Sequence, residues 1–199
     1  MTTNWTDKNI LIIGAARQGL ALARYLTKHG AKVTLNDKRM PHELQEEQDF
    51  LKDIEVEWML GAHFSSVLKG KDLVCLSGGI PLNLPLVRDA QRRKIPLSND
   101  TQIFLEAAPC RTIGITGSAG KTTTTTLVGR MAIEAYRKST NKVWIGGNIG
   151  DPLINYVDQM KKDDLAILEI SSFQLDQMTL STDIAAVLNV TPNHLDRHG

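Results

Sequence analysis

A glycine-rich segment in the middle of the chain has the composition of a phosphate-binding loop. Its residues are Thr116, Gly117, Ser118, Ala119, Gly120, Lys121, Thr122 and Thr123. An apolar strand pattern precedes the segment and a helical pattern follows it, so glycines would bring backbone N–H groups and a helix N-terminus close to phosphate oxygens. Lys121 can neutralise the β- and γ-phosphates, and the Thr122 hydroxyl can bind Mg²⁺. The segment therefore predicts binding of ATP with Mg²⁺, in a variant loop that has Ile115 where the strict pattern has glycine.

Three polar residues follow later apolar runs at the points where strands would end. Asn148 comes after the run 143–145, Glu169 after the run 165–168, and His194 after the run 184–190. The carboxyl ends of parallel strands meet at one edge of a sheet, where ligands bind. Glu169 could hold the metal there, with Thr122. Position alone leaves structural alternatives open, namely an exposed strand-end glutamate, a turn asparagine and a structural histidine.

A second strand–loop–helix pattern lies near the N-terminus. Gly14, Ala16 and Gly19 resemble the dinucleotide fingerprint with its middle glycine replaced, and Asp37 lies near the distance of the acidic residue that binds ribose. This pattern predicts a Rossmann-like domain. The methyl group of Ala16 disfavours NAD, which leaves another nucleotide-linked ligand or a merely structural turn.

Short apolar runs alternate with helical patterns along the whole chain, which is typical of α/β folds with parallel sheets. The predicted strands are residues 9–13, 32–35, 56–58, 73–76, 95–97, 112–116, 143–145, 165–170 and 184–190. The cycle restarts after residues 106–110. We therefore predict a Rossmann-like domain over 1–108 and an incomplete P-loop-type ATP-binding domain over 109–199.

Composition argues against several classes of partner. A formal net charge of +1 gives no general attraction to nucleic acid or anionic membranes. No apolar run approaches the ~18 residues of a membrane span, and the polar start of the chain lacks a signal peptide pattern, so we expect a cytoplasmic protein. Cys75 and Cys110 lack metal-binding or redox spacing.

Taken together, these strings resemble the Mur ligases. The loop with its flanks, residues 114–123, is similar to the ATP loop of that family, and residues 146–150, 168–175 and 189–197 are similar to further family strings. These three further strings resemble most the family member that joins D-glutamate to UDP-N-acetylmuramoyl-L-alanine in peptidoglycan precursor synthesis. The resemblance implies that ATP phosphorylates the substrate carboxylate and that the amine then displaces phosphate.

The resemblance also implies roles for individual residues. The catalytic residues would be Lys121, Asn148, Glu169 and His194, with Thr122, Glu169 and His194 at Mg²⁺. The first domain would bind the UDP part of the substrate. The candidate substrate-binding residues of the first domain are Gly14, Ala15, Ala16, Arg17, Gln18, Asp37, Lys38, Arg39, Ser77, Gly78 and Gly79. Those of the second domain are Asn148, Ser171 and His194.

Two departures from the family pattern bear on function. The family loop usually has Thr-Asn where this chain has Ser118 and Ala119, which we expect to act through backbone N–H groups. Family members run to about three domains, so we expect a monomeric N-terminal fragment with little or no turnover alone. Alternatives are a Mur ligase for another amino acid, a non-catalytic nucleotide-sugar module, and an NAD(P)-dependent oxidoreductase fused to a P-loop domain.

Overall fold

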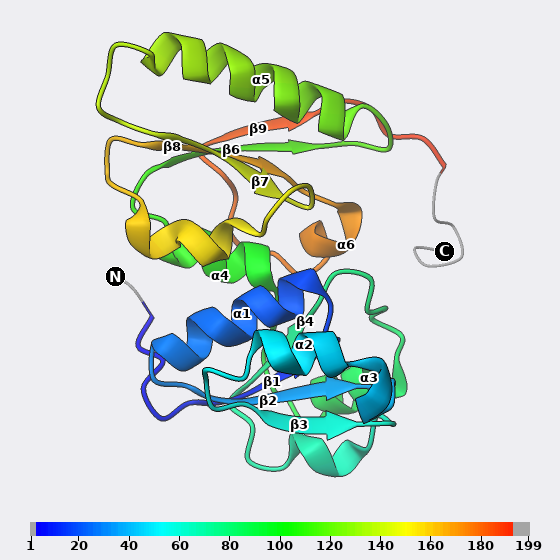
Figure 1. Cartoon of the computed structure of the whole chain (residues 1–199). Coiled ribbons are helices and arrows are strands. Elements are labelled where there is room, and N and C mark those ends of the chain that lie inside the picture. The colour runs from blue at the N-terminus through cyan, green and yellow to red at the C-terminus, as the bar shows by residue number, and fades with distance from the viewer. Residues whose placement is uncertain (1–2, 193–199) are drawn as a thin grey trace. The chain divides into compact units, whose positions relative to one another are not determined.

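A computed structural model describes residues 3–192 and divides the chain into two compact units, residues 1–100 and residues 101–199. Each unit contains one parallel β-sheet with helices packed against it (Figure 1). The α/β class expected from the alternating patterns is confirmed. The division falls at the start of the helix that precedes residue 108, and the domain boundary at 108/109 stays a prediction.

The first unit is a doubly wound sheet with strand order β3-β2-β1-β4-β5. Its strands are β1 (Asn9–Ile13), β2 (Lys32–Asp37), β3 (Glu57–Leu60), β4 (Leu73–Leu76) and β5 (Leu97–Ser98). Its helices are α1 (Arg17–Lys28), η1 (Pro41–Glu43), α2 (Gln45–Phe50), η2 (Ser65–Leu68) and α3 (Pro85–Arg92). The order reverses between β1 and β4, so the crevice beyond their carboxyl ends is the expected ligand site.

The core of the first unit lies on both faces of the sheet, because successive side chains along a strand point to opposite faces. Leu11 and Ile13 pack with η2 and α3 in one apolar cluster on one face of the sheet. Ile10 and Ile12 point to the opposite face and are fully buried. Because both faces are covered, β1 reads as a continuous apolar run.

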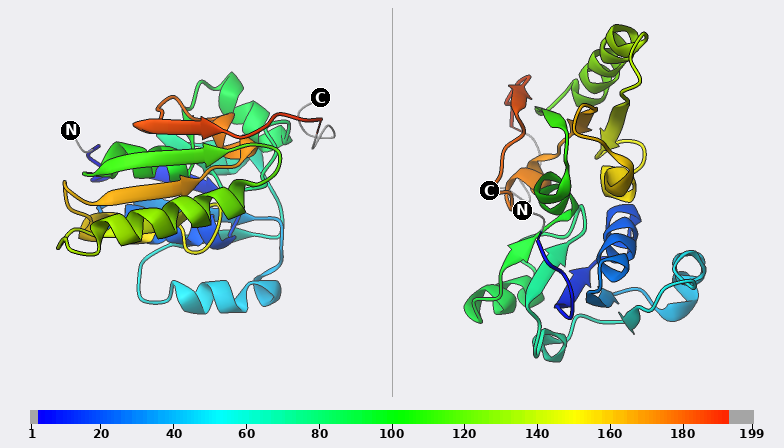
Figure 2. Two further views of the ribbon diagram at one scale, coloured as in Figure 1. Left: turned by 90° about the horizontal axis from the view of Figure 1, so that it is seen from above. Right: turned by 90° about the vertical axis from the view of Figure 1, so that its left-hand side faces the viewer.

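The second unit has strand order β7-β8-β6-β9. Its strands are β6 (Arg111–Thr116), β7 (Val143–Gly147), β8 (Leu165–Glu169) and β9 (Ile184–Val187), and its helices are α4 (Asp100–Ala107), α5 (Lys121–Tyr136), η3 (Leu153–Gln159) and α6 (Ser172–Leu175). The helix α5 covers one face of the sheet and η3 lies on the other (Figures 1 and 2). Register places Glu169 opposite both Ile115 and Gly147.

The structure differs from the sequence expectations in several element bounds, most clearly in one strand and two helices. The strand predicted over 184–190 ends at Val187, because the residues that follow bond to the loop before α5. The helices α4 and α6 were not predicted. In α4 the buried side chains include Thr101 and Gln102, whose polar atoms bond to the segment 174–180, so the helix shows no apolar stripe.

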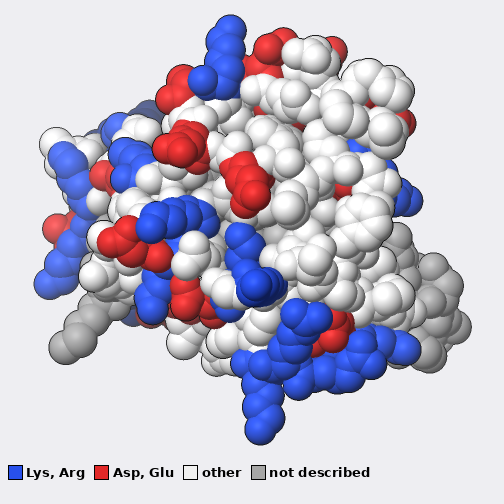
Figure 3. Space-filling model, turned by 90° about the horizontal axis from the view of Figure 1, so that it is seen from below, with Lys and Arg blue, Asp and Glu red and all other residues white. Residues whose placement is uncertain are grey.

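No helix in the described part of the chain combines the length and apolar character of a membrane span. Figure 3 shows acidic and basic side chains interspersed over one face, with a group of basic side chains at its lower edge. Cys75 and Cys110 are both buried, and neither is in a disulfide among the described residues.

Candidate functional site

The loop between β6 and α5 is built to expose the start of a helix. Gly120 is the N-cap of α5 and has a left-handed backbone with φ 81°, which favours glycine. The ammonium of Lys121 lies over the loop and donates to the carbonyl of Gly117 at 2.7 Å. A positive charge and the unpaired first-turn N–H groups of α5 therefore meet at one point, as anion binding requires.

The first half of this loop is bonded to the segment after β9. The N–H groups of Ser118 and Ala119 donate to the backbone and side-chain oxygens of Asn189 at 3.0 and 2.9 Å. The contact of these two residues with phosphate stays a prediction. The N–H groups of the first helical turn, in which Thr122 and Thr123 lie, are free of partners within the helix and can donate to a phosphate.

The carboxylate of Glu169 joins the ends of three separate segments. Thr122 donates its hydroxyl to Oε2 of Glu169 at 2.7 Å, and Asn148 donates its amide Nδ2 to Oε1 at 2.9 Å. Glu169 is only 2% exposed. A buried carboxylate is costly without such partners, and this one receives a hydrogen bond on each oxygen. The two side chains predicted to share a metal are thus brought together.

The end of β7 is pinned against the end of β8. Asn148 donates its backbone N–H to the carbonyl of Glu169 at 2.9 Å. Gly147 has φ 97°, and a Cβ at this position would lie 2.5 Å from the same carbonyl oxygen. Only glycine lets the two strands approach this closely, and that approach places the Asn148 amide on the Glu169 carboxylate.

Oxygen donors at this edge suit Mg²⁺, which prefers carboxylate, hydroxyl and phosphate oxygens. Within residues 3–192 no group of three or more His, Cys, Asp or Glu side chains forms a metal cluster. Among these residues, Glu169 and Thr122 are oxygen donors that the structure brings together at this edge, and their binding of a metal stays a prediction. His194, predicted as a further metal residue, lies outside the described residues.

Ser171 has a local structural role in the described fold. It is the N-cap of α6, and its hydroxyl accepts a hydrogen bond from the N–H of Gln174 at 3.3 Å. The Gln174 side chain bonds back to the N–H of Ser171 and reaches the hydroxyl of Thr101. This capping box stabilises the turn directly after Glu169. The predicted contact of Ser171 with substrate stays a prediction.

The crevice of the first unit brings two predicted loops together. Ser77 follows β4 and donates its N–H to the carbonyl of Ile13 at 2.9 Å, which places the segment Ser77-Gly78-Gly79 beside the loop Gly14-Ala15-Ala16-Arg17-Gln18. The Ser77 hydroxyl oxygen is buried and has no hydrogen-bond partner among the described residues. An unsatisfied buried hydroxyl beside a helix N-terminus is the arrangement that a polar ligand would complete.

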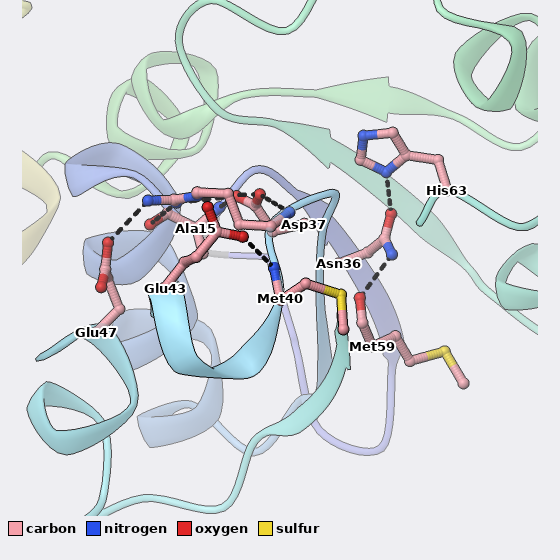
Figure 4. A network of polar contacts seen from close by, with 9 residues as sticks. Ala15, Asn36, Asp37, Met40, Glu43, Glu47, Met59 and His63 are labelled. Atoms are coloured by element: carbon pink, nitrogen blue, oxygen red, sulfur yellow. Dashed lines mark hydrogen bonds and ion pairs between the residues drawn. The ribbon is translucent and has the colours of Figure 1, made fainter. Parts of the chain in front are cut away.

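Asp37 at the end of β2 is engaged by protein groups. Its Oδ2 accepts from the N–H of Ala15 at 2.8 Å and from Arg39 at 3.0 Å, and Arg39 also contacts Glu47 (Figure 4). Burial alone would raise the pKa of Asp37, but the hydrogen bonds from Arg39 and Ala15 and the charge of Arg39 lower it to about 2. The carboxylate therefore fixes the first loop, whereas Lys38 beside it is exposed.

Two protein-family models match this chain, one in each of its two units. The model of the Mur ligase MurD-like N-terminal domain matches residues 8–99, and the model of the Mur ligase middle domain matches residues 115–199. This chain belongs to the Mur ligase family.

Two similar relatives of this Mur ligase chain have the same name. The chain is 40% identical over 200 residues to UDP-N-acetylmuramoylalanine–D-glutamate ligase of Pelotomaculum thermopropionicum, an alignment that covers 100% of this chain and 43% of the relative. It is 37% identical to the ligase of the same name from Koribacter versatilis, with 96% and 42% covered. The chain thus spans less than half the length of these relatives.

Solved structures agree on the fold. The UDP-N-acetylmuramate:L-alanyl-gamma-D-glutamyl-meso-diaminopimelate ligase from Neisseria meningitides matches with a TM-score of 0.58 at 18% identity, over 98% of this chain and 64% of that one. The UDP-N-acetylmuramate-alanine ligase from Thermotoga maritima matches with a TM-score of 0.54 at 19% identity, over 96% and 43%. Both support a Rossmann-like unit followed by part of a second parallel-sheet unit.

Proposed function

We propose that this Mur ligase chain binds MgATP and UDP-N-acetylmuramoyl-L-alanine as part of a cytoplasmic, monomeric enzyme that adds D-glutamate to that substrate. The observation that carries the proposal is the cluster at one sheet edge, where Glu169 bonds to Thr122 and Asn148 beside the Lys121 ammonium. Such an edge supplies what phosphoryl transfer requires, namely positive charge, amide donors and an oxygen ligand for a metal.

The chemistry explains why ATP is needed. A carboxylate is a poor electrophile, so its oxygen first attacks the γ-phosphorus of ATP, forming an acyl phosphate and releasing ADP. The amino group of D-glutamate then attacks the acyl carbon, and the C–O bond to phosphate breaks. The product is an amide together with free phosphate and a proton.

Each residue of the edge would contribute to the first step. Lys121 and the first-turn N–H groups of α5 bind and orient the phosphates. Thr122 and Glu169 would hold Mg²⁺, which supplies charge neutralisation at the phosphate oxygens when bound. Asn148 would orient the reacting acyl end. His194 would assist at a second Mg²⁺, by resemblance to the family.

The first unit would hold the UDP part of the substrate. The N-terminus of α1 follows a glycine turn and lies beside the unpaired Ser77 hydroxyl, which suits a diphosphate. Arg39 and Lys38 lie at the end of β2, where a nucleoside would reach.

The amino acid is proposed from the names of the relatives at 37–40% identity. A Mur ligase for a different amino acid is the alternative within the family. A non-catalytic nucleotide-sugar module is the alternative from another class, and the satisfied contacts of Glu169 argue against it, because a decayed site would not retain them.

Calorimetric titration tests the proposal directly. The chain is titrated with MgATP, with UDP-N-acetylmuramoyl-L-alanine and with NADH. Binding of the first two and not of NADH is expected. Binding of NADH in place of the UDP-sugar would overturn the assignment of the first unit, and absence of MgATP binding would overturn that of the second.

A phosphate-release assay tests the amino acid in an enzyme of full family length that carries this chain's residues. Release that depends on D-glutamate and not on L-alanine or L-lysine is expected. Dependence on another amino acid would favour the alternative within the family.

A further inference from the structure

The segment after β9 runs alongside the phosphate loop. Leu188 donates its N–H to the carbonyl of Thr116 at 3.0 Å, and Ser118 donates its N–H to the carbonyl of Asn189 at 3.0 Å. These alternating bonds continue the pairing of β6 with β9 beyond the end of the strand. The first half of the loop is therefore held as an extension of the sheet.

The side chain of Asn189 adds a second connection. Its Oδ1 accepts from the N–H of Ala119 at 2.9 Å, and its Nδ2 donates to the carbonyl of Ala119 at 3.0 Å. A carboxamide supplies both the acceptor for the N–H and the donor for the carbonyl of one residue. Aspartate would keep the acceptor alone, and alanine would keep neither.

Two neighbouring contacts support this connection. The hydroxyl of Ser118 accepts from the N–H of Thr191 at 2.9 Å and donates to the carbonyl of Thr191 at 3.1 Å. A Cβ at Gly117 would lie 3.2 Å from the backbone N and O of Asn189, which shows how closely the two segments pack.

These contacts decide which groups of the loop remain for phosphate. The N–H groups of Ser118 and Ala119 are both used by Asn189, and the carbonyl of Gly117 accepts from Lys121. The N–H groups of the first turn of α5 are among the donors that remain. Their direction depends on where Ala119 is held, because that residue immediately precedes the N-cap Gly120.

We propose that Asn189 is a positioning residue for the phosphates of ATP, acting through the peptide of Ala119. It fixes the point at which the loop ends and α5 begins, and it thereby aims the first-turn N–H groups and Lys121 at the same phosphate. The inference rests on the proposed function, since it names a residue that prepares the same site without touching the nucleotide.

The test compares Asn189→Ala and Asn189→Asp with Asn155→Ala, which removes an exposed asparagine from η3 in the same unit. Hydrogen exchange of the Ser118 and Ala119 amides is measured by NMR without nucleotide. The dissociation constant for MgATP is then measured by calorimetry, and the thermal midpoint of each variant is recorded.

Faster exchange at Ala119 is expected in Asn189→Ala, which loses the acceptor of that N–H. About fivefold to tenfold weaker MgATP binding is expected in both Asn189 variants, because both lose the bond to the Ala119 carbonyl, with a midpoint like that of Asn155→Ala. A role in stability alone would lower the midpoint and leave the affinity of the folded protein unchanged. If Asn189→Ala does not fold, Asn189→Asp carries the comparison, because it keeps the bond from the Ala119 N–H.

The outcomes separate the two proposals. Unchanged MgATP affinity in the Asn189 variants, with normal affinity in the parent chain and loss in Lys121→Ala, would overturn the positioning role and leave the proposed function intact. Unchanged exchange at Ala119 in Asn189→Ala would also overturn it. Failure of the parent chain to bind MgATP would overturn the proposed function and the positioning role with it.

Discussion

The hydroxyl of Thr122 donates a hydrogen bond of 2.7 Å to the carboxylate of Glu169, which lies 47 positions further along the chain. Thr122 lies in the first turn of α5, and Glu169 lies at the end of β8, an inner strand of the sheet. The pair places an oxygen ligand for a cation directly beside a phosphate-binding helix start. Several predictions of binding and stability depend on this arrangement and on the glycines that allow it.

Replacing Glu169 with glutamine is expected to weaken MgATP binding by at least about tenfold, because a neutral amide is a much poorer Mg²⁺ ligand. Stability without nucleotide should not fall greatly, since the substitution also removes a buried charge. Calorimetry with MgATP and urea unfolding measure the two effects. Glu134→Gln on the exposed side of α5 is the control. Equal affinities in the two variants would contradict the assignment of Glu169 as a metal ligand.

Replacing Lys121 with alanine should weaken MgATP binding by about tenfold or more, because the ammonium is the positive side chain at the loop. The matched control is Lys162→Ala, which removes an exposed lysine from the same unit. Raising the salt concentration should reduce the difference in MgATP affinity between the variant and the parent, because salt screens the charge of Lys121. A difference that does not change with salt would argue that Lys121 acts through loop structure and not through charge.

Gly147→Ala should destabilise the second unit by more than about 2 kcal/mol, since its Cβ would lie 2.5 Å from the Glu169 carbonyl oxygen at φ 97°. Gly150→Ala is the control. It shares a positive φ of 57° but meets no atom within 4 Å, so about 1 kcal/mol is expected there. Urea unfolding compares the two variants. Equal losses would show that backbone strain, and not the close approach of β7 to β8, requires glycine at position 147.

Asp37→Asn should make the stability of the first unit less dependent on pH in the acid range. The folded pKa of about 2 lies below the ordinary value of 3.8, so the carboxylate stabilises the fold fully above about pH 4. That stabilisation is lost as the pH falls towards 2. The difference between parent and variant should be on the order of 2 kcal/mol at pH 7 and should shrink below pH 4.

Unfolding in urea at pH 7, 4 and 3 measures this difference. The control is Asp7→Asn, which removes an exposed carboxylate that pairs with Lys32 at the surface. Such pairs contribute little, so a small and nearly constant effect is expected there. A constant difference for Asp37→Asn as well would show that its ionisation does not stabilise the fold.

Ser77→Ala should leave stability unchanged or slightly higher, because the buried hydroxyl has no partner among the described residues. Binding of UDP-N-acetylmuramoyl-L-alanine should weaken by about fivefold, as expected for one lost hydrogen bond. The control is Ser98→Ala, since the Ser98 hydroxyl is also buried without a partner but belongs to β5. Equal substrate affinity in both variants would remove Ser77 from the proposed UDP site.

Local pattern predicted much of the fold and the phosphate loop. The strand, glycine turn and helix around Lys121 are encoded in neighbouring residues, because phosphate loops need those types at that spacing. The same holds for Gly14 and the start of α1. The helix α4 was missed because its buried Thr101 and Gln102 are polar, and their partners lie far along the chain.

The sequence by itself determined that the chain has two strand–loop–helix turns, one of them with a lysine and a threonine suited to nucleotide phosphates. Only the tertiary structure decided that Glu169 meets Thr122 and Asn148, and that Asn189 holds Ala119. These pairs follow from the strand order β7-β8-β6-β9, which brings distant strand ends together. Strand order is set by the packing of the whole sheet, and no local stretch of residues encodes it.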